Sequence, residues 1–192
     1  MITPRKIWGG LGNTMFQHAY IYAQMKRGEI PDIYVQDEKY FKEFADDIKA
    51  IYGTEIEKSV YISLHIRRGD YIDNPFYVDL TRTDYYDKAI AEFPDETFLI
   101  FCADRQEGSN DMEDLEWCEK WAKEKGIDYL IQFGKDEIED LNAMAGCKGH
   151  IMANSSFSWW ASYLGSGKVV CPKDWFTDGI QRVSLLDNWK KI

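Results

Sequence analysis

The sequence predicts an α/β protein built around a parallel β-sheet. Short apolar runs of strand length alternate with segments of helical periodicity through most of the 192 residues. Strands that alternate with helices of about 8 to 15 residues are typical of βαβ units joined by right-handed crossovers. From residue 97 onward this alternation is regular, and with the strand that begins at residue 59 it predicts a Rossmann-like unit of about five strands.

The composition is that of a globular protein. A chain of 192 residues with 45% hydrophobic and 15% aromatic content can bury one sizeable core or two small lobes. Its formal net charge of −10 and isoelectric point near 4.8 argue against a nucleic-acid backbone or an anionic membrane surface as the partner. Any anionic ligand must therefore bind at a local site.

No segment of the sequence is typical of a targeting signal or a membrane span. Residues 1–8 lack the apolar core of a signal peptide, and no apolar run is long enough to cross a bilayer. The four cysteines, Cys102, Cys118, Cys147 and Cys171, lie far apart and form no Cys-x-x-Cys motif. We expect reduced thiols in the core of a soluble, cytoplasmic protein rather than disulfides or a zinc site.

The first predicted element is a short strand over residues 6–8, followed by the run Gly9-Gly10-Leu11-Gly12-Asn13. An amphipathic helix over residues 14–27 comes next, with Gly28 as its C-cap. Such a layout can point backbone N–H groups at an anion. The spacing is neither the dinucleotide fingerprint nor a P-loop, so a plain strand-to-helix turn is the alternative. A strand over residues 32–35 and a charged helix over residues 37–51 complete this segment.

The central element is a predicted strand over residues 59–66, which carries two adjacent arginines to its own end. The period of two along a strand puts His65 and Arg67 on one side and Arg68 on the other. We assign Arg67 to the ligand crevice, because a guanidinium forks onto a carboxylate or phosphate. We expect Asp70 or a backbone carbonyl to hold Arg68. A solvated turn after the strand is the alternative.

The remaining elements follow in regular order. Residues 73–83 have no clear period and predict a loop, which is a candidate substrate lid because it follows the arginine pair. Helices are predicted over residues 84–93, 112–125, 136–145 and 154–164, and strands over residues 97–103, 128–133, 150–153 and 168–171.

Polar residues follow two further strands at the edge where an open α/β sheet binds its ligands. Asp104 can accept paired N–H groups from a guanine edge or a ribose hydroxyl, or it can cap a helix. The run Asn154-Ser155-Ser156 is an ordinary N-cap sequence that also supplies donors suited to a diphosphate. We interpret Trp159 and Trp160 as core packing rather than as a platform for sugar stacking.

Three stretches together resemble the bacterial and viral α-1,2-fucosyltransferases of glycosyltransferase family eleven. They are Gly9-Gly10-Leu11-Gly12-Asn13 with Met15-Phe16-Gln17, His65-Ile66-Arg67-Arg68-Gly69-Asp70-Tyr71, and Asn154-Ser155-Ser156-Phe157-Ser158-Trp159-Trp160. The resemblance implies a two-lobed GT-B fold, GDP-L-fucose as the donor, inversion at the anomeric carbon and no metal or other cofactor. The absence of an Asp-x-Asp motif from the sequence agrees with the last point.

The resemblance also implies roles for individual residues. Arg67 would grip the β-phosphate, His65 would lie by the ribose or base, and Asp104 would read guanine. Asn13 could orient the acceptor, and Asp70 would be engaged with an arginine, so no base for the acceptor hydroxyl is evident. The predicted catalytic residues are Arg67, Asn13 and Asp70, and the predicted donor-binding residues are Gly10, Gly12, His65, Arg67, Arg68, Asp104, Asn154, Ser155, Ser156 and Ser158.

We expect residues 1–58 to form a reduced acceptor-side lobe and residues 59–192 the donor lobe, with the C-terminal segment packing back on the first lobe. Two departures from the family pattern concern the first lobe. Thr14 stands where the family favours Gln, and only about thirty residues separate the first helix from the strand that carries His65, where family members usually have a much longer segment. The resemblance implies transfer of L-fucose to a hydroxyl, such as the 2-OH of a galactoside, in a protein peripheral to the membrane that carries this glycan acceptor. A non-catalytic nucleotide-sugar-binding remnant and a glycan-binding protein with surface tryptophans are the alternatives.

Overall fold

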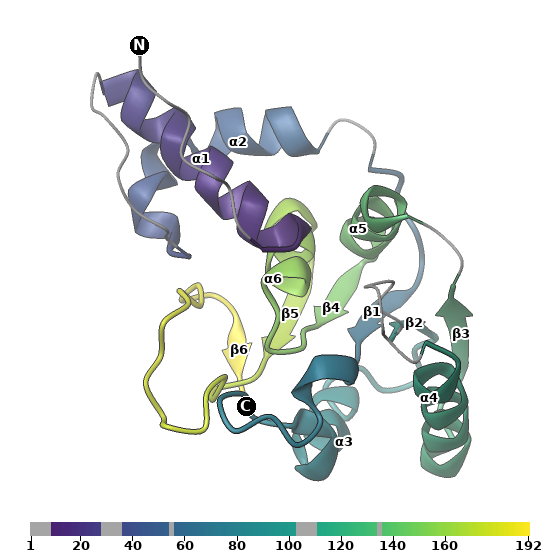
Figure 1. Cartoon of the computed structure of the whole chain (residues 1–192). Helices are drawn as coiled ribbons and strands as arrows, with labels where there is room; N and C mark the ends of the chain where they lie inside the picture. Colours follow the sequence, from purple (N-terminus) through teal and green to yellow (C-terminus); the bar gives the residue numbers. More distant parts are fainter. Residues whose placement is uncertain (1–8, 28–35, 54–55, 103–110, 134–135) are drawn as a thin grey trace.

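The computed structural model describes residues 9–27, 36–53, 56–102, 111–133 and 136–192 (Figure 1). A six-stranded sheet with every strand pair parallel runs in the order β3-β2-β1-β4-β5-β6. This is the strand order of a Rossmann fold, in which the chain reverses its direction of travel between β1 and β4. The strands are β1 (Ile62–His65), β2 (Phe98–Phe101), β3 (Tyr129–Gln132), β4 (Gly149–Ile151), β5 (Lys168–Cys171) and β6 (Lys190–Lys191).

Helices cover both faces of the sheet. One apolar cluster joins helices α3 and α4 to one face, and a second joins α5 and α6 to the other. The α-helices are α1 (Leu11–Arg27), α2 (Ala45–Tyr52), α3 (Tyr85–Ile90), α4 (Asp111–Lys125), α5 (Glu137–Gly146) and α6 (Ser156–Leu164). None of the described helices is long and apolar enough to span a membrane.

Successive side chains of β1 point to opposite faces of the sheet. Ile62, Leu64 and Ile66 are almost fully buried in the cluster beneath α3 and α4. Ser63 and His65 point to the opposite face, where the Ser63 hydroxyl lies 2.9 Å from Nδ1 of His150 on β4. The strand therefore delivers His65, and the residue two positions later, to the face covered by α5 and α6.

The N-terminal helices α1 and α2 lie beyond α5 and α6, away from the sheet (Figure 1). They share one apolar core with these helices, in which the rings of Phe41 and Trp160 stack at 5.6 Å between centroids. The ring of Phe16 on α1 packs against Trp159 and Trp160, with 4.6 and 5.0 Å between ring centroids. The two tryptophans are fully buried, as the sequence predicts.

The structure corrects several predicted elements. The charged stretch over residues 37–51 is broken into two 3-10 turns, Glu38–Tyr40 and Lys42–Phe44, before α2. The predicted five strands become six, because β6 pairs with β5 near the C-terminus. The strands predicted over residues 6–8 and 32–35 lie outside the described residues.

The C-terminal segment runs back toward residues from the start of the chain. The Ser184 amide donates to the carbonyl of Gln36 at 3.1 Å, and its own carbonyl accepts from Nε1 of Trp159 at 2.5 Å. Trp189 is buried in the core shared by α1, α2, α5 and α6. The boundary at residue 58 between two lobes stays a prediction.

Candidate functional site

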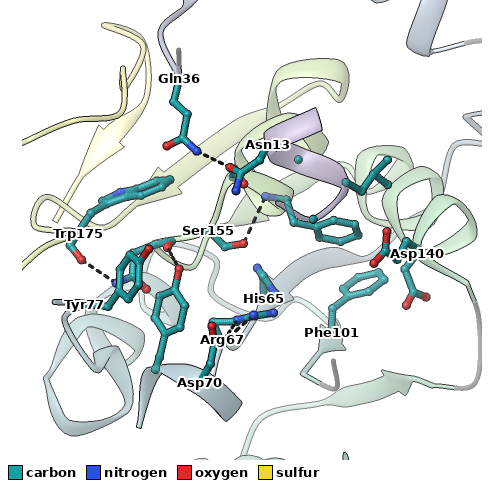
Figure 2. Close-up of a pocket in the computed structure, with 18 of the residues that line it drawn as sticks. Asn13, Gln36, His65, Arg67, Asp70, Tyr77, Phe101, Asp140, Ser155 and Trp175 are labelled. Carbon is teal, nitrogen blue, oxygen red and sulfur yellow. Dashed lines mark hydrogen bonds and ion pairs between the residues drawn. The ribbon is translucent and has the colours of Figure 1, made fainter. Parts of the chain in front are cut away.

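A pocket of about 560 Å³ opens at the carboxyl ends of β1 and β4, where the strand order reverses (Figure 2). Ligands of open α/β sheets bind at this kind of switch point. Its lining residues are Gly10, Leu11, Gly12, Asn13, Gln36, His65, Arg67, Asp70, Tyr71, Tyr77, Phe101, Cys102, Gln132, Glu137, Asp140, Asn154, Ser155, Ser156, Phe157, Trp175, Phe176 and Arg182.

Arg67 lines this pocket two residues after His65. Its Nε and Nη2 atoms donate to Oδ1 of Asp70 at 3.1 and 2.8 Å, and its guanidinium lies 5.3 Å from the centre of the Tyr71 ring. The Asp70 side chain is 58% exposed and also lines the pocket, so the ion pair faces the cavity rather than the protein interior. A ligand in the pocket can therefore reach both members of the pair.

Arg68 is placed on the other side of the sheet, as the period of two predicts. Its Nε donates to Oδ1 of Asp114 on α4 at 2.8 Å, and its guanidinium lies 4.2 Å from the Trp117 ring. Asp70 pairs with Arg67 instead, so the expectation that Asp70 or a backbone carbonyl holds Arg68 is wrong. Arg68 does not line the pocket, and its carboxylate partner fixes it against α4.

His65 is a buried, neutral imidazole in the pocket wall. Burial first, and the charge of Arg67 second, lower its pKa to about 3. Its Nδ1 atom is buried and has no hydrogen-bond partner within the described residues, although a neutral imidazole has one donor and one acceptor nitrogen. A buried polar atom that lacks a partner is costly, so this position suits a ligand hydroxyl or base that would satisfy it.

The start of α6 forms a second wall. The Ser155 hydroxyl accepts from the Phe157 amide at 3.3 Å and caps the helix, and both Ser155 and Ser156 line the pocket. The Asn154 side chain instead donates to the backbone carbonyls of Val78 and Trp175 at 2.9 and 3.0 Å. Asn154 thus holds two loops together at the edge of the pocket.

Ser158 is among the predicted donor-binding residues, and the structure places it away from the pocket. Its side chain is 1% exposed and its hydroxyl lies 3.3 Å from the carbonyl oxygens of Ala153 and Ser155. Ser158 is not among the lining residues, and it stabilises the turn into α6 from inside. Asp104, the predicted guanine-reading acid, lies outside the described residues.

The start of α1 meets the start of α6 across this pocket. A Cβ atom on Gly12 would lie 2.5 Å from the carbonyl carbon of Ser156, so only glycine permits this approach. A Cβ atom on Gly10 would meet nothing within 4 Å. Asn13 accepts from the Gln36 side chain through its Oδ1 atom. Two helix N-termini, neither with an acidic residue in its first turn, therefore point their partial positive charges at one cavity.

Tyr77 lies in the loop over residues 73–83, the predicted candidate lid, and it lines the pocket. Sequence reasoning missed its neighbours in this wall, Trp175, Phe176 and Arg182, and the acidic side chains of Glu137 and Asp140 from α5. A signal for part of this wall was present, since residues 172–182 follow the end of β5 and therefore lie at the same sheet edge as Arg67. The segment has no recognisable motif that would mark these side chains as pocket residues.

Comparisons with known proteins point to one family. The model of a family described as Glycosyl transferase family 11 matches residues 10–191. An Escherichia coli protein named O-antigen biosynthesis glycosyltransferase WbnK is 33% identical over 138 residues, which cover 66% of this chain and 43% of that protein. The Escherichia coli alpha-1,2-colitosyltransferase is 30% identical over 166 residues, covering 73% of this chain and 54% of the relative. The chain thus spans about half the length of these relatives. No solved structure gives a significant match.

Proposed function

The chain belongs to glycosyl transferase family 11, and we propose that it moves L-fucose from GDP-L-fucose to a hydroxyl of a glycan acceptor, with inversion at the anomeric carbon. The observation that carries this proposal is Arg67, which lines a pocket between two helix N-termini in a protein of net charge −10. Guanidinium groups and helix N-termini are the groups that proteins use to bind phosphate oxygens.

As the bond from the anomeric carbon to the diphosphate breaks, negative charge develops on the departing β-phosphate. Arg67 and the amides at the start of α6 stabilise this charge more in the transition state than in the ground state. Asp70 holds the Arg67 fork in one orientation, so little reorganisation is needed when the charge appears. His65 remains neutral and can bond to a hydroxyl of the ribose or to the base.

The acceptor hydroxyl must lose a proton when it attacks. Among the described residues, three carboxylates line the pocket, Asp70, Glu137 and Asp140, and Asp70 is already paired with Arg67. The proposal therefore gives the proton to a carboxylate of α5, that of Glu137 or Asp140. We propose the 2-OH of a galactoside as the acceptor, with Asn13 orienting it. The name of one relative specifies an α-1,2 transfer, which supports this choice of hydroxyl.

The proposal is tested by incubating the protein with GDP-L-fucose and a panel of galactosides and following the release of GDP and the formation of fucosylated product. The expected result is transfer to acceptors that carry a 2-OH group and no transfer to acceptors that lack this hydroxyl. Release of GDP without any fucosylated product would refute transfer.

A second candidate is a module that binds a nucleotide sugar without transferring it. It predicts saturable binding of GDP and GDP-L-fucose, with no product on any acceptor. The same titrations and assays separate the two candidates, because only the transferase forms product.

A further inference from the structure

Two loops meet in one wall of the pocket, on the side where Figure 2 shows Tyr77 and Trp175. One loop follows β1 and the other follows β5, and they pair through an antiparallel bridge between Tyr77 and Phe176. The Val78 amide donates to the Trp175 carbonyl at 3.1 Å, and the Asn154 side chain donates to the carbonyls of Val78 and Trp175 at 2.9 and 3.0 Å. These bonds fix the backbone on both sides of Tyr77.

Two further rings hold the side chain of Tyr77. Its ring stacks on that of Tyr71 with 4.3 Å between centroids and 14° between planes, and it packs against Phe176 with 5.6 Å between centroids. Contacts of this kind restrict the rotation of an aromatic ring. The hydroxyl at the end of the Tyr77 ring is therefore presented at a set position.

The Tyr77 hydroxyl differs from those of the tyrosines packed around it. The Tyr71 hydroxyl donates to the Asn154 carbonyl at 3.0 Å, and the Tyr86 hydroxyl donates to the His65 carbonyl at 3.0 Å. Tyr77 is partly exposed and lines the pocket, and none of the described residues forms a hydrogen bond with its hydroxyl. Because a phenol hydroxyl both donates and accepts, this one can bond to a ligand in the pocket.

The surroundings of Tyr77 favour a sugar over a phosphate as its partner. The rings in contact with it, those of Tyr71 and Phe176, are uncharged, and Trp175 adds a third aromatic side chain to this wall. Phosphate sites use guanidinium groups or helix N-termini. An aromatic wall that carries an occasional hydroxyl suits a neutral ligand, which it orients through few polar contacts.

The position of Tyr77 relative to Arg67 fits the sugar of a nucleotide-sugar donor. The Arg67 guanidinium lies 5.3 Å from the centre of the Tyr71 ring, and this ring stacks directly on Tyr77, so a single ring separates Arg67 from Tyr77. In a nucleotide sugar the sugar is bonded directly to the terminal phosphate. A terminal phosphate on Arg67 therefore brings the sugar within reach of Tyr77.

We propose that the Tyr77 hydroxyl forms a hydrogen bond with a hydroxyl group of the donor's sugar, next to the phosphate held by Arg67. This inference rests on the proposed nucleotide-sugar donor. It gives the pocket a residue that binds the transferred sugar itself, and it gives the paired loops the role of presenting that residue.

The test is calorimetric titration of the full chain with GDP and with GDP-L-fucose in the absence of acceptor. Tyr77→Phe removes the hydroxyl and keeps the ring. It should weaken GDP-L-fucose binding about three- to tenfold, the effect of one neutral hydrogen bond, and change GDP binding less than about twofold. An equal effect on both ligands, or an effect on neither, would overturn the inference.

Tyr61→Phe is the matched control for this titration. Tyr61 is also partly exposed, but it does not line the pocket, and none of the residues that the structure describes forms a hydrogen bond with its hydroxyl. The same chemical change should therefore leave the affinities for GDP and GDP-L-fucose unchanged. If Tyr61→Phe weakened GDP-L-fucose binding as much as Tyr77→Phe does, the effect would not come from a contact in the pocket and the inference would fall.

Urea denaturation separates a lost ligand contact from a folding defect. Tyr77→Phe should unfold at the same urea concentration as wild type, because its hydroxyl has no partner among the described residues. Tyr71→Phe should unfold at a lower concentration, since it removes the bond to the Asn154 carbonyl. Equal losses of stability in the two variants would show that the Tyr77 hydroxyl serves the fold and would overturn its role in binding.

The outcomes also separate this inference from the proposed function when GDP-mannose and UDP-galactose are titrated alongside. If wild type prefers one of these and Tyr77→Phe weakens its binding but not that of the matching diphosphate, the fucosyl donor is wrong and the sugar contact stands. If wild type binds GDP-L-fucose more tightly than GDP and Tyr77→Phe keeps this difference, the donor stands and the inference falls. Binding of no nucleotide sugar by wild type would overturn both.

Discussion

Arg67 and Arg68 are neighbours in the chain but serve opposite faces of the sheet. Arg67 enters the pocket with His65, whereas Arg68 pairs with Asp114 on α4. The pleat of β1 is the cause, because successive side chains of an extended chain alternate between faces. The positive charge offered to a ligand at the end of this strand is therefore that of Arg67.

Replacing Arg67 with alanine should lower kcat/KM for transfer by about 10² to 10³, the usual effect of removing one preorganised donor to a developing oxyanion. The measurement is the rate of GDP release from GDP-L-fucose in the presence of acceptor. Arg82→Ala is the control, since it removes an exposed arginine outside the pocket. Normal turnover in Arg67→Ala would refute the role given to this residue.

His65 and His150 should make the protein less stable as the pH falls. Burial lowers their pKa values to about 3 and about 4, whereas an unfolded histidine titrates near 6.5. Between these values the unfolded chain binds protons that the folded chain does not. The stability is therefore fully present above about pH 6.5 and declines below it.

Urea unfolding at pH 7, 6 and 5 measures this loss. Each histidine held neutral contributes a slope of up to about 1.4 kcal/mol per pH unit. His65→Gln should remove about half of the combined slope. A free energy of unfolding that stays constant from pH 7 to 5 would contradict the buried, neutral state of both side chains.

At the scale of elements, the pocket depends on the approach of α1 to α6. Gly12 makes backbone contact with Ser156 at the start of α6. This contact directs both helix N-termini at the pocket, and the buried rings of Phe16, Trp159 and Trp160 hold the helices together behind it. The glycine at position 12 thus serves helix packing, and its effect on a ligand is indirect.

Gly12→Ala should destabilise the fold by about 1–3 kcal/mol, the usual cost of forcing an extra methyl into a packed contact. The added Cβ atom would lie 2.5 Å from a backbone carbon, so α1 must move away from α6. Gly10→Ala, which adds its Cβ atom to open space, is the matched control. Urea denaturation of both variants makes the comparison, and equal stability would contradict the packing role of Gly12.

At the scale of the whole molecule, periodicity predicted much of the architecture. The parallel sheet and its helices follow from apolar runs between residues 62 and 171. The pocket residues after β1 and β4 could be predicted as well, because polar side chains that follow parallel strands meet at one edge of the sheet. His65, Arg67, Ser155 and Ser156 come together there.

Other features depend on contacts that a local pattern does not encode. Strand β6 consists of Lys190–Lys191, which has no apolar character, and pairing with β5 makes it a strand. The partner of Arg68 is 46 residues away on α4, so only tertiary packing reveals it. The pocket wall that contains Tyr77 and Phe176 likewise forms where two loops far apart in the sequence pair through these residues.

The most direct test of the pocket chemistry is a calorimetric titration of wild type and Arg67→Gln with GDP, ADP and UDP. We predict saturable binding to wild type that is selective for GDP, and a loss of about tenfold or more in Arg67→Gln, because a charged hydrogen bond to phosphate is removed. Absence of nucleotide binding, or equal GDP affinity in the two proteins, would contradict the proposal that Arg67 binds the diphosphate of the donor.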